Sequence, residues 1–242
     1  MNPSDDTALI VGNTSTVLLW DECKFSRIEA STSENLWAVA WNPRGRVALI
    51  TGNHGTLLKY CDGTIQKIGN CRANLRHVSW RPMTDQALIT SNCFAEEFIP
   101  SPNLFNYNAE TDTVIPLNEG RVDLMGVDWN PSGESALVVG YDVVRHNGFI
   151  AHCDRTALSP IAFQNRRVYP VTVAWDDLGD VAAIATATTQ LGMSQGVIYL
   201  WDGEGLRLIY KNAEFFFSSV TWSREDGNLV GLASTATRTF SC

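Results

Sequence analysis

The sequence predicts an all-β fold built from a repeated four-stranded unit. A short apolar segment, a tryptophan and a turn recur along the chain, and the repeat tryptophans are 39 to 49 residues apart. The chain has 242 residues, of which 45% are hydrophobic and 18% charged, so it can bury a substantial core. No segment of useful length shows the 3.6-residue apolar period of a helix. The repeat tryptophans are Trp41, Trp80, Trp129, Trp175 and Trp222.

Each repeat is expected to contribute four strands, of which the first ends at the tryptophan. A turn such as 42–45 then leads to a second strand, expected at 8–11, 48–51, 87–90, 136–139, 182–185 and 229–232. The third strand ends at an aromatic residue or histidine, commonly before a turn that contains Asp, as at Trp20, Tyr60, His152 and Trp201. The fourth strands are expected at 26–30, 64–68, 113–117, 158–163 and 206–210.

This period suits one β-propeller blade per repeat. The tryptophan-Asn-Pro turns (129–131, for example) and the Trp-Asp ends of the third strands (20–21 and 201–202) resemble those of the WD40-like β-propellers. The resemblance covers nearly the whole chain and implies a single propeller domain over residues 1–242. The Gly-His element that opens many family repeats is missing here, so the repeats are divergent. We expect the tryptophans to pack between blades.

The two ends of the chain carry incomplete repeats. Residues 1–12 align with 129–140, so the first blade lacks its first strand, whereas 218–222 supplies a first strand near the C-terminus. A second strand at 229–233 and a third at 237–240 follow it. Two closures are open: five blades, in which 218–222 completes the N-terminal blade, or six blades with the first and last incomplete. An unpaired edge invites another chain, so a homodimer through the terminal blades is an alternative.

Candidate binding residues lie on one expected face of the propeller. The resemblance implies that the connections between second and third strands share this face with the segments that lead into the next first strand. The former connections are expanded at 91–103, 140–148 and 186–196, and such loops on a rigid scaffold often bind partners. The expected partner-binding residues are Phe94, Glu97, Phe98, Arg121, Tyr141, Arg145, His146, Arg166 and Arg167. Arg72 and Arg76 are expected in the joining loops of the same face.

Arginine is unusually frequent relative to lysine, at 14 residues against 4. Arginines beside aromatic side chains are favoured at protein interfaces and at carboxylate or phosphate sites. The sequence therefore favours a protein or peptide partner on the face described above.

The sequence offers little for catalysis. The four histidines are scattered over the repeats, so they do not predict a zinc site, and His152 takes an aromatic packing position. The six cysteines lack C-x-x-C spacing, and Cys71 and Cys93 are expected to be a reduced pair on one face. No nucleophile elbow or phosphate-binding glycine loop is present. We expect no enzyme activity, no cofactor and no metal.

Charge and terminal sequence bear on partners and location. A net charge of -8 argues against nucleic acid and anionic membranes as partners. No apolar run approaches the roughly 18 residues of a membrane helix, and no signal peptide is visible, so the cytoplasm is predicted. The leading function is a non-catalytic scaffold that binds a protein or peptide. The alternatives are a propeller that binds a small ligand or glycan, or acts on one at its central channel, and a truncated propeller that works as a homo-oligomer.

Overall fold

A computed structural model describes residues 1–69, 73–92, 100–154, 157–161, 163, 168–190, 193–223 and 225–235. These residues form strands and turns, which confirms the all-β prediction. Across the ranges just given there is no helix long and apolar enough to cross a membrane. The chain divides into two compact units, Met1–Trp129 and Asn130–Cys242, each described by itself. The single domain over 1–242 and the two closures therefore stay predictions.

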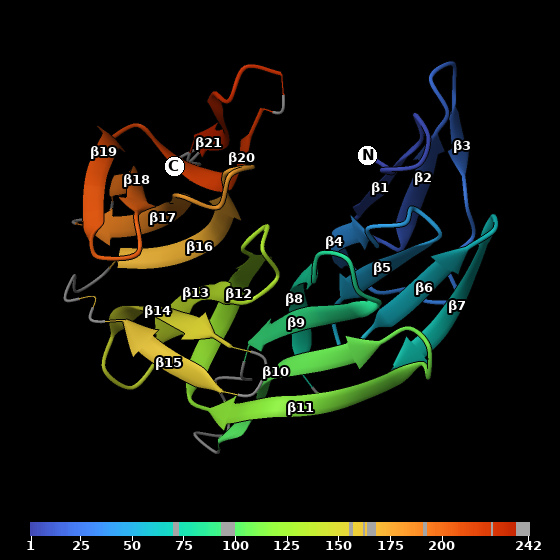
Figure 1. The fold of residues 1–242 in the computed structure, drawn as a ribbon, viewed down its shortest axis with the longest axis horizontal. Coiled ribbons are helices and arrows are strands. Elements are labelled where there is room, and N and C mark those ends of the chain that lie inside the picture. The colour runs from blue at the N-terminus through green and yellow to red at the C-terminus, as the bar shows by residue number, and fades with distance from the viewer. Residues whose placement is uncertain are drawn as a thin grey trace, which may run out of the picture. The chain divides into compact units, whose positions relative to one another are not determined.

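Unit 1 is a series of antiparallel sheets. Its strands are β1 (Ala8–Gly12), β2 (Thr16–Trp20), β3 (Phe25–Arg27), β4 (Leu36–Trp41), β5 (Val47–Gly52), β6 (Leu57–Cys61), β7 (Thr64–Gly69), β8 (Asn74–Trp80), β9 (Gln86–Asn92), β10 (Ser101–Asn108), β11 (Thr113–Gly120) and β12 (Val122–Trp129). β1-β2-β3 form a three-stranded sheet, and β4-β5-β6-β7 and β8-β9-β10-β11 form four-stranded sheets, each in chain order (Figure 1). The expected repeat of four consecutive antiparallel strands is thus confirmed here.

Unit 2 continues the same pattern. Its strands are β13 (Ala136–Asp142), β14 (Asn147–Cys153), β15 (Leu158–Ile161), β16 (Val168–Trp175), β17 (Ala182–Gln190), β18 (Met193–Trp201), β19 (Leu206–Asn212), β20 (Phe215–Trp222) and β21 (Leu229–Thr235). β13, β14 and β15 pair in that order, β16 to β19 form a four-stranded sheet, and β20 pairs with β21. The expected strand at 237–240 lies outside the described residues.

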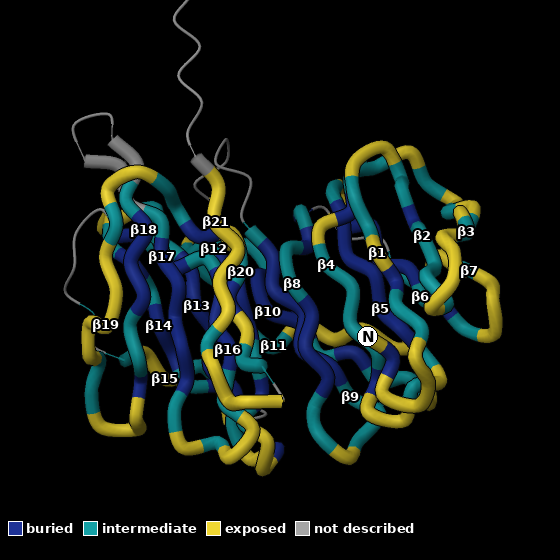
Figure 2. The backbone as a smooth tube through the Cα atoms, turned by 90° about the horizontal axis from the view of Figure 1, so that it is seen from above, coloured by how far each residue is buried: buried dark blue, intermediate teal, exposed yellow. Residues whose placement is uncertain are grey.

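The core of each unit lies between neighbouring sheets. The second strands are buried along most of their length, as β5 and β17 show, whereas the outer strands β7 and β19 are largely exposed (Figure 2). One cluster in unit 1 joins the sheet of β4 to β7 with the sheet of β8 to β11. Its largest buried members are Leu49, Leu57, Leu75, Trp80, Ile89, Phe105 and Tyr107. Burial of apolar area between sheets is therefore what holds consecutive repeats together.

Two of the repeat tryptophans, Trp80 and Trp222, hydrogen-bond to the preceding sheet. Trp80 Nε1 donates to the Ala40 carbonyl of β4 at 2.9 Å, and Trp222 Nε1 donates to the Ala174 carbonyl of β16 at 2.9 Å. The indole thus buries a large ring and satisfies its one donor in the same contact. The prediction that these residues pack between blades is confirmed for this pair.

The asparagine after the tryptophan explains the recurring Asn-Pro turn. Asn42 Oδ1 accepts from Val47 N at 3.1 Å, closing its own turn, and Asn42 Nδ2 donates to Asp85 Oδ1 of the next sheet at 3.3 Å. In unit 2, Asn130 Nδ2 donates to the Gly179 carbonyl of the next tryptophan turn at 2.9 Å. The motif therefore joins consecutive sheets as well as turning the chain.

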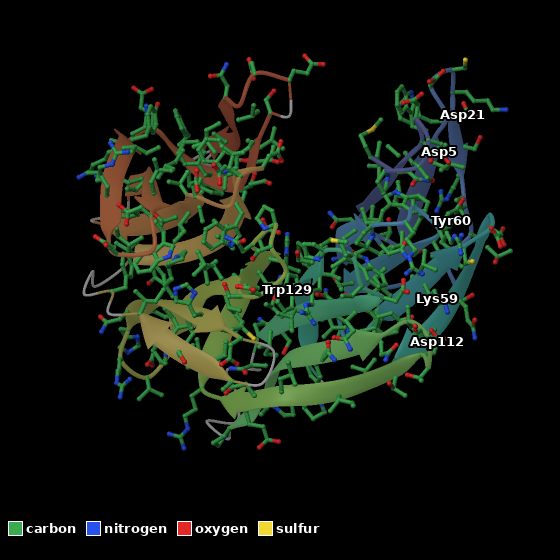
Figure 3. The ribbon with its side chains drawn as sticks, in the orientation of Figure 1. Asp5, Asp21, Lys59, Tyr60, Asp112 and Trp129 are labelled. Carbon is green, nitrogen blue, oxygen red and sulfur yellow. The ribbon has the colours of Figure 1, made fainter. Side chains whose placement is uncertain are left out.

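An ion pair in unit 1 links strand β6 of one sheet to the β10–β11 turn of the next sheet. Lys59 Nζ lies 2.7 Å from Asp112 Oδ1 (Figure 3). The Tyr107 hydroxyl donates to the same oxygen at 2.6 Å. Burial opposes ionisation of the Asp112 carboxyl, but the hydrogen bonds from Lys59 and Tyr107 outweigh it and lower its pKa. The network stabilises the contact of β6 with the β10–β11 hairpin.

Two of the three expanded connections are longer hairpins, so the expectation of loops there is wrong. β13 runs to Asp142 and β14 begins at Asn147, and β17 pairs with β18 as far as Gln190 opposite Met193. Paired backbone satisfies its polar groups within the hairpin, which an irregular loop would leave to water. In the third connection, β9 ends at Asn92, and 93–99 lie outside the described residues.

Candidate functional site

In each unit, one end of the sheets carries the turns between second and third strands together with the segments that lead into first strands. We call this end the crossover face, and the opposite end, with the turns after the repeat tryptophans, the tryptophan face. In unit 1, Thr14 N donates to Asn35 Oδ1 at 2.9 Å and His54 N donates to Asn74 Oδ1 at 3.0 Å. The turn residues Thr14 and His54 have φ of 51° and 50°. These contacts confirm that the two kinds of connection share one face.

A β-bulge at the same repeat position shapes the first strands that reach this face. The register shifts between Leu36 and Ala38 in β4, which leaves Trp37 unpaired, and between Leu75 and His77 in β8, which leaves Arg76 unpaired. A bulge redirects a side chain away from the regular alternation of a strand. Trp37 and Arg76 therefore meet each other on the crossover face instead of entering the core.

The Trp37 ring is exposed yet fixed in orientation. It is 45% exposed, its Nε1 donates to Asn53 Oδ1 at 2.6 Å, and the Arg76 guanidinium carbon lies 4.9 Å from its ring centroid. With the Asn92 amide in the orientation that satisfies both of its groups, its oxygen accepts from Arg76 Nη2 at 3.1 Å and its nitrogen donates to the Asn74 carbonyl at 3.2 Å, so that it fixes the guanidinium in turn. An aromatic ring held in this way is ordered before any partner arrives.

Arg76 is half-buried, and no carboxylate among the described residues forms an ion pair with it. Burial lowers the pKa of its guanidinium, and the charge of Asp123 acts in the opposite direction. Within the described part of the chain, Arg76 makes no ion pair within 4.0 Å, and its Nε is buried without a hydrogen-bond partner. The group stays protonated at neutral pH, because an arginine pKa is far above 7.

A second polar contact lies on the same face of unit 1. His54 Nδ1 is 2.8 Å from Glu34 Oε2, and both side chains lie partly in solvent. His54 belongs to the turn that Asn74 caps and that also carries Asn53, so it lies in the segment next to Trp37. The crossover face of unit 1 thus presents an aromatic ring among charged and amide groups.

The crossover face of unit 2 carries a cluster of rings. The Tyr141 and Tyr169 ring centroids are 4.3 Å apart, and the Tyr141 hydroxyl lies 3.1 Å from His146 Nδ1. Burial, followed by the neighbouring Tyr169 hydroxyl, raises the pKa of Tyr141 to about 12. Arg145 pairs with Asp142 at 3.5 Å across the β13–β14 turn. Three expected partner-binding residues, Tyr141, Arg145 and His146, are therefore together.

Of the remaining expected partner-binding residues, the structure describes only Arg121. Arg121 is exposed in unit 1, in the segment that joins β11 to β12. Phe94, Glu97, Phe98, Arg166 and Arg167 lie outside the described residues, as do Arg72, Cys71 and Cys93. Sequence reasoning missed Trp37 and the asparagines around it. An extra tryptophan four positions before the repeat tryptophan was the available signal for Trp37.

The histidines of the described chain do not converge. Burial lowers the pKa of the His77 ring, which extends from strand β8. His152 packs edge-on against Trp201, with centroids 5.6 Å apart, which confirms its expected packing role. A search of the described ranges finds no group of three or more His, Cys, Asp or Glu side chains able to hold a metal ion.

Comparison with known proteins decides the architecture. A chain from the crystal structure of a nidogen/laminin complex matches with a TM-score of 0.68 and 13% sequence identity, covering 93% of this chain and 84% of that chain. The fold is a β-propeller. It has roughly five to six blades. No family model matches the sequence, and no curated protein matches it. At this identity the match concerns the propeller fold alone.

Proposed function

We propose that this protein is a non-catalytic, WD40-like propeller in the cytoplasm that binds a protein or peptide through its crossover faces. The carrying observation is Trp37, a large aromatic ring that is 45% exposed and fixed by Asn53 and Arg76. Exposed aromatic and arginine side chains contribute most to binding when they are already ordered. The nidogen/laminin match, which comes from a complex between proteins, is compatible with this role.

The ring cluster of unit 2 supports the same proposal. Tyr141 and Tyr169 combine an apolar ring with a hydroxyl, a combination that is enriched at protein interfaces. Arg145, with 80% of its side chain exposed, adds a cation beside the rings. Each unit therefore offers aromatic and cationic groups on its crossover face.

Partner capture by the immobilised protein tests the proposal. The wild type is compared with Trp37→Ala combined with Tyr141→Ala, and with a matched control, Met83→Ala, which removes a 91% exposed side chain on the tryptophan face of unit 1. We expect the same proteins from a lysate of the source cells with wild type and control, and their loss with the double variant. Equal capture by all three would place binding elsewhere.

A polar pocket favours a second candidate function, the binding of a small ligand. It has a volume of about 260 Å³ on the tryptophan face of unit 1, with Arg44, Arg81, Asn108 and Glu110 among its lining residues. Arg44 is already paired with Asp85 at 3.1 Å, so a ligand would compete with that carboxylate. A thermal-shift screen of small polar molecules tests this function, because a ligand of the native state raises its apparent stability. Hits must disappear in Arg44→Ala.

A further inference from the structure

We infer that Trp37 and Arg76 form a recognition site for a carboxylate-bearing peptide, in which the carboxylate meets the Arg76 guanidinium and an adjacent apolar side chain covers Trp37. The inference rests on the proposed function and specifies the chemistry of its partner. It also assigns the affinity to one pair of residues on the crossover face of unit 1.

Arg76 is a cation without a matching carboxylate among the described residues. The Arg76 guanidinium packs over Trp37, and its Nη2 donates a hydrogen bond to the Asn92 amide oxygen. Among the described residues, no carboxylate lies within 4.0 Å of it. Asp123 acts on it only through a longer-range charge interaction. A partly desolvated guanidinium gains most from a carboxylate, which matches its planar fork of donors.

Neutral amide side chains orient the cation and the ring beside it. Among the described residues, the side-chain partners of the Trp37 indole and the Arg76 guanidinium in hydrogen bonds are the amides of Asn53 and Asn92, which orient the ring and the guanidinium without neutralising charge. An amide frame fixes the direction of Arg76 while leaving its positive charge for a ligand. The frame therefore favours an anion over a cation next to Arg76.

An exposed aromatic ring lies beside the cation. A free inorganic anion would engage Arg76 alone and leave Trp37, which is 45% exposed, in water. A peptide can place a carboxylate and a neighbouring proline, aromatic or aliphatic side chain on the two groups together. Burying an ordered ring under such a side chain adds hydrophobic affinity at small entropic cost. A peptide is therefore the occupant that uses both residues.

The test begins with a displayed library of random 12-residue peptides selected on the full chain. Enriched peptides are synthesised with free and with amidated C-termini, and their affinities are measured by fluorescence anisotropy. The variants are Arg76→Gln, Arg76→Lys and Trp37→Ala, with Arg81→Gln as the matched control. Arg81 also lies over a tryptophan, Trp129, but on the tryptophan face of the same unit, where it lines the polar pocket, so its substitution also shows whether a peptide binds in that pocket instead. Circular dichroism verifies that every variant is folded.

We expect enriched peptides to carry Asp, Glu or a required free C-terminus next to an apolar residue. Their affinity should fall at least about tenfold in Arg76→Gln and in Trp37→Ala, fall less in Arg76→Lys, and stay within about twofold in Arg81→Gln. Loss on amidation assigns the C-terminal carboxylate, and retention assigns a side chain.

Two results would overturn the inference in different ways. Peptides that lose affinity in Tyr141→Ala but bind Arg76→Gln normally would refute this site while leaving the proposed function intact. Enrichment of no peptide, together with unchanged partner capture by the Trp37 and Tyr141 double variant, would refute both. Peptides enriched in Lys or Arg and insensitive to Arg76→Gln would also exclude carboxylate recognition at this site.

Discussion

Unit 1 contains two arginine–tryptophan pairs that differ in what remains accessible on the ring. Arg81 lies 5.5 Å from the Trp129 ring, which is only 5% exposed, whereas Arg76 lies 4.9 Å from Trp37, which is 45% exposed. Trp129 occupies the repeat position, and its ring is taken up by packing. Trp37 occupies a bulge position outside the repeat. Its contacts with Asn53 and Arg76 hold the ring at the surface. The same pair of residue types thus serves the fold in one place and a surface in the other.

The largest expected effect separates the two tryptophans by stability. Trp129→Ala should lower the free energy of unfolding by about 3–5 kcal/mol, because it leaves a cavity at a buried ring. Trp37→Ala should cost less than about 1 kcal/mol, because much of that ring is already in water. Urea denaturation followed by circular dichroism measures both. Similar losses in the two variants would refute the contrast between them.

A second prediction extends the contrast to ion pairs. Lys59, with a side chain only 17% exposed, pairs with Asp112, whereas Arg145, 80% exposed, pairs with Asp142. Lys59→Met should destabilise by about 1–2 kcal/mol, because it removes a charged hydrogen bond and leaves Asp112 to Tyr107 alone. Arg145→Met should change stability by less than about 0.5 kcal/mol. The same denaturation experiment decides, and a larger loss in Arg145→Met would contradict the account.

The smallest effect concerns pH. Burial lowers the pKa of His77 in the folded state below its ordinary 6.5. Below about pH 6.5 the unfolded chain then binds a proton that the folded chain does not, so His77 reduces stability as the pH falls toward its folded-state value. We expect the urea midpoint to drop between pH 7.5 and 5.5 in the wild type, and to drop less in His77→Gln. An equal drop in both proteins would show that His77 does not contribute.

The sequence was sufficient for the strands but not for the site, and the reason is physical. The repeat tryptophans and Asn-Pro turns act locally and between adjacent sheets, so their spacing predicted the strand order. Trp37 and Arg76 owe their positions to a register shift against β5 and β9, which depends on the pairing of whole strands. Alternation within one segment carries no sign of such a shift.

The extended hairpins were missed for a related reason. Residues 186–190 are rich in threonine, and β-branched residues favour strands. The expanded connection therefore continues the pairing of β17 with β18. The length of this connection, taken alone, indicated a loop. The β13–β14 hairpin still brought Tyr141, Arg145 and His146 together, because a short turn concentrates neighbouring side chains.

The most direct test of the central claim is a double-mutant cycle between Arg76 and the carboxylate of a selected peptide. The affinities of wild type and Arg76→Gln are measured for the acidic peptide and for its amide counterpart. Direct pairing predicts a coupling energy of at least about 1.5 kcal/mol, because the two substitutions remove the same contact. A coupling energy near zero, with the two losses additive, would show that the carboxylate binds elsewhere and would contradict the account.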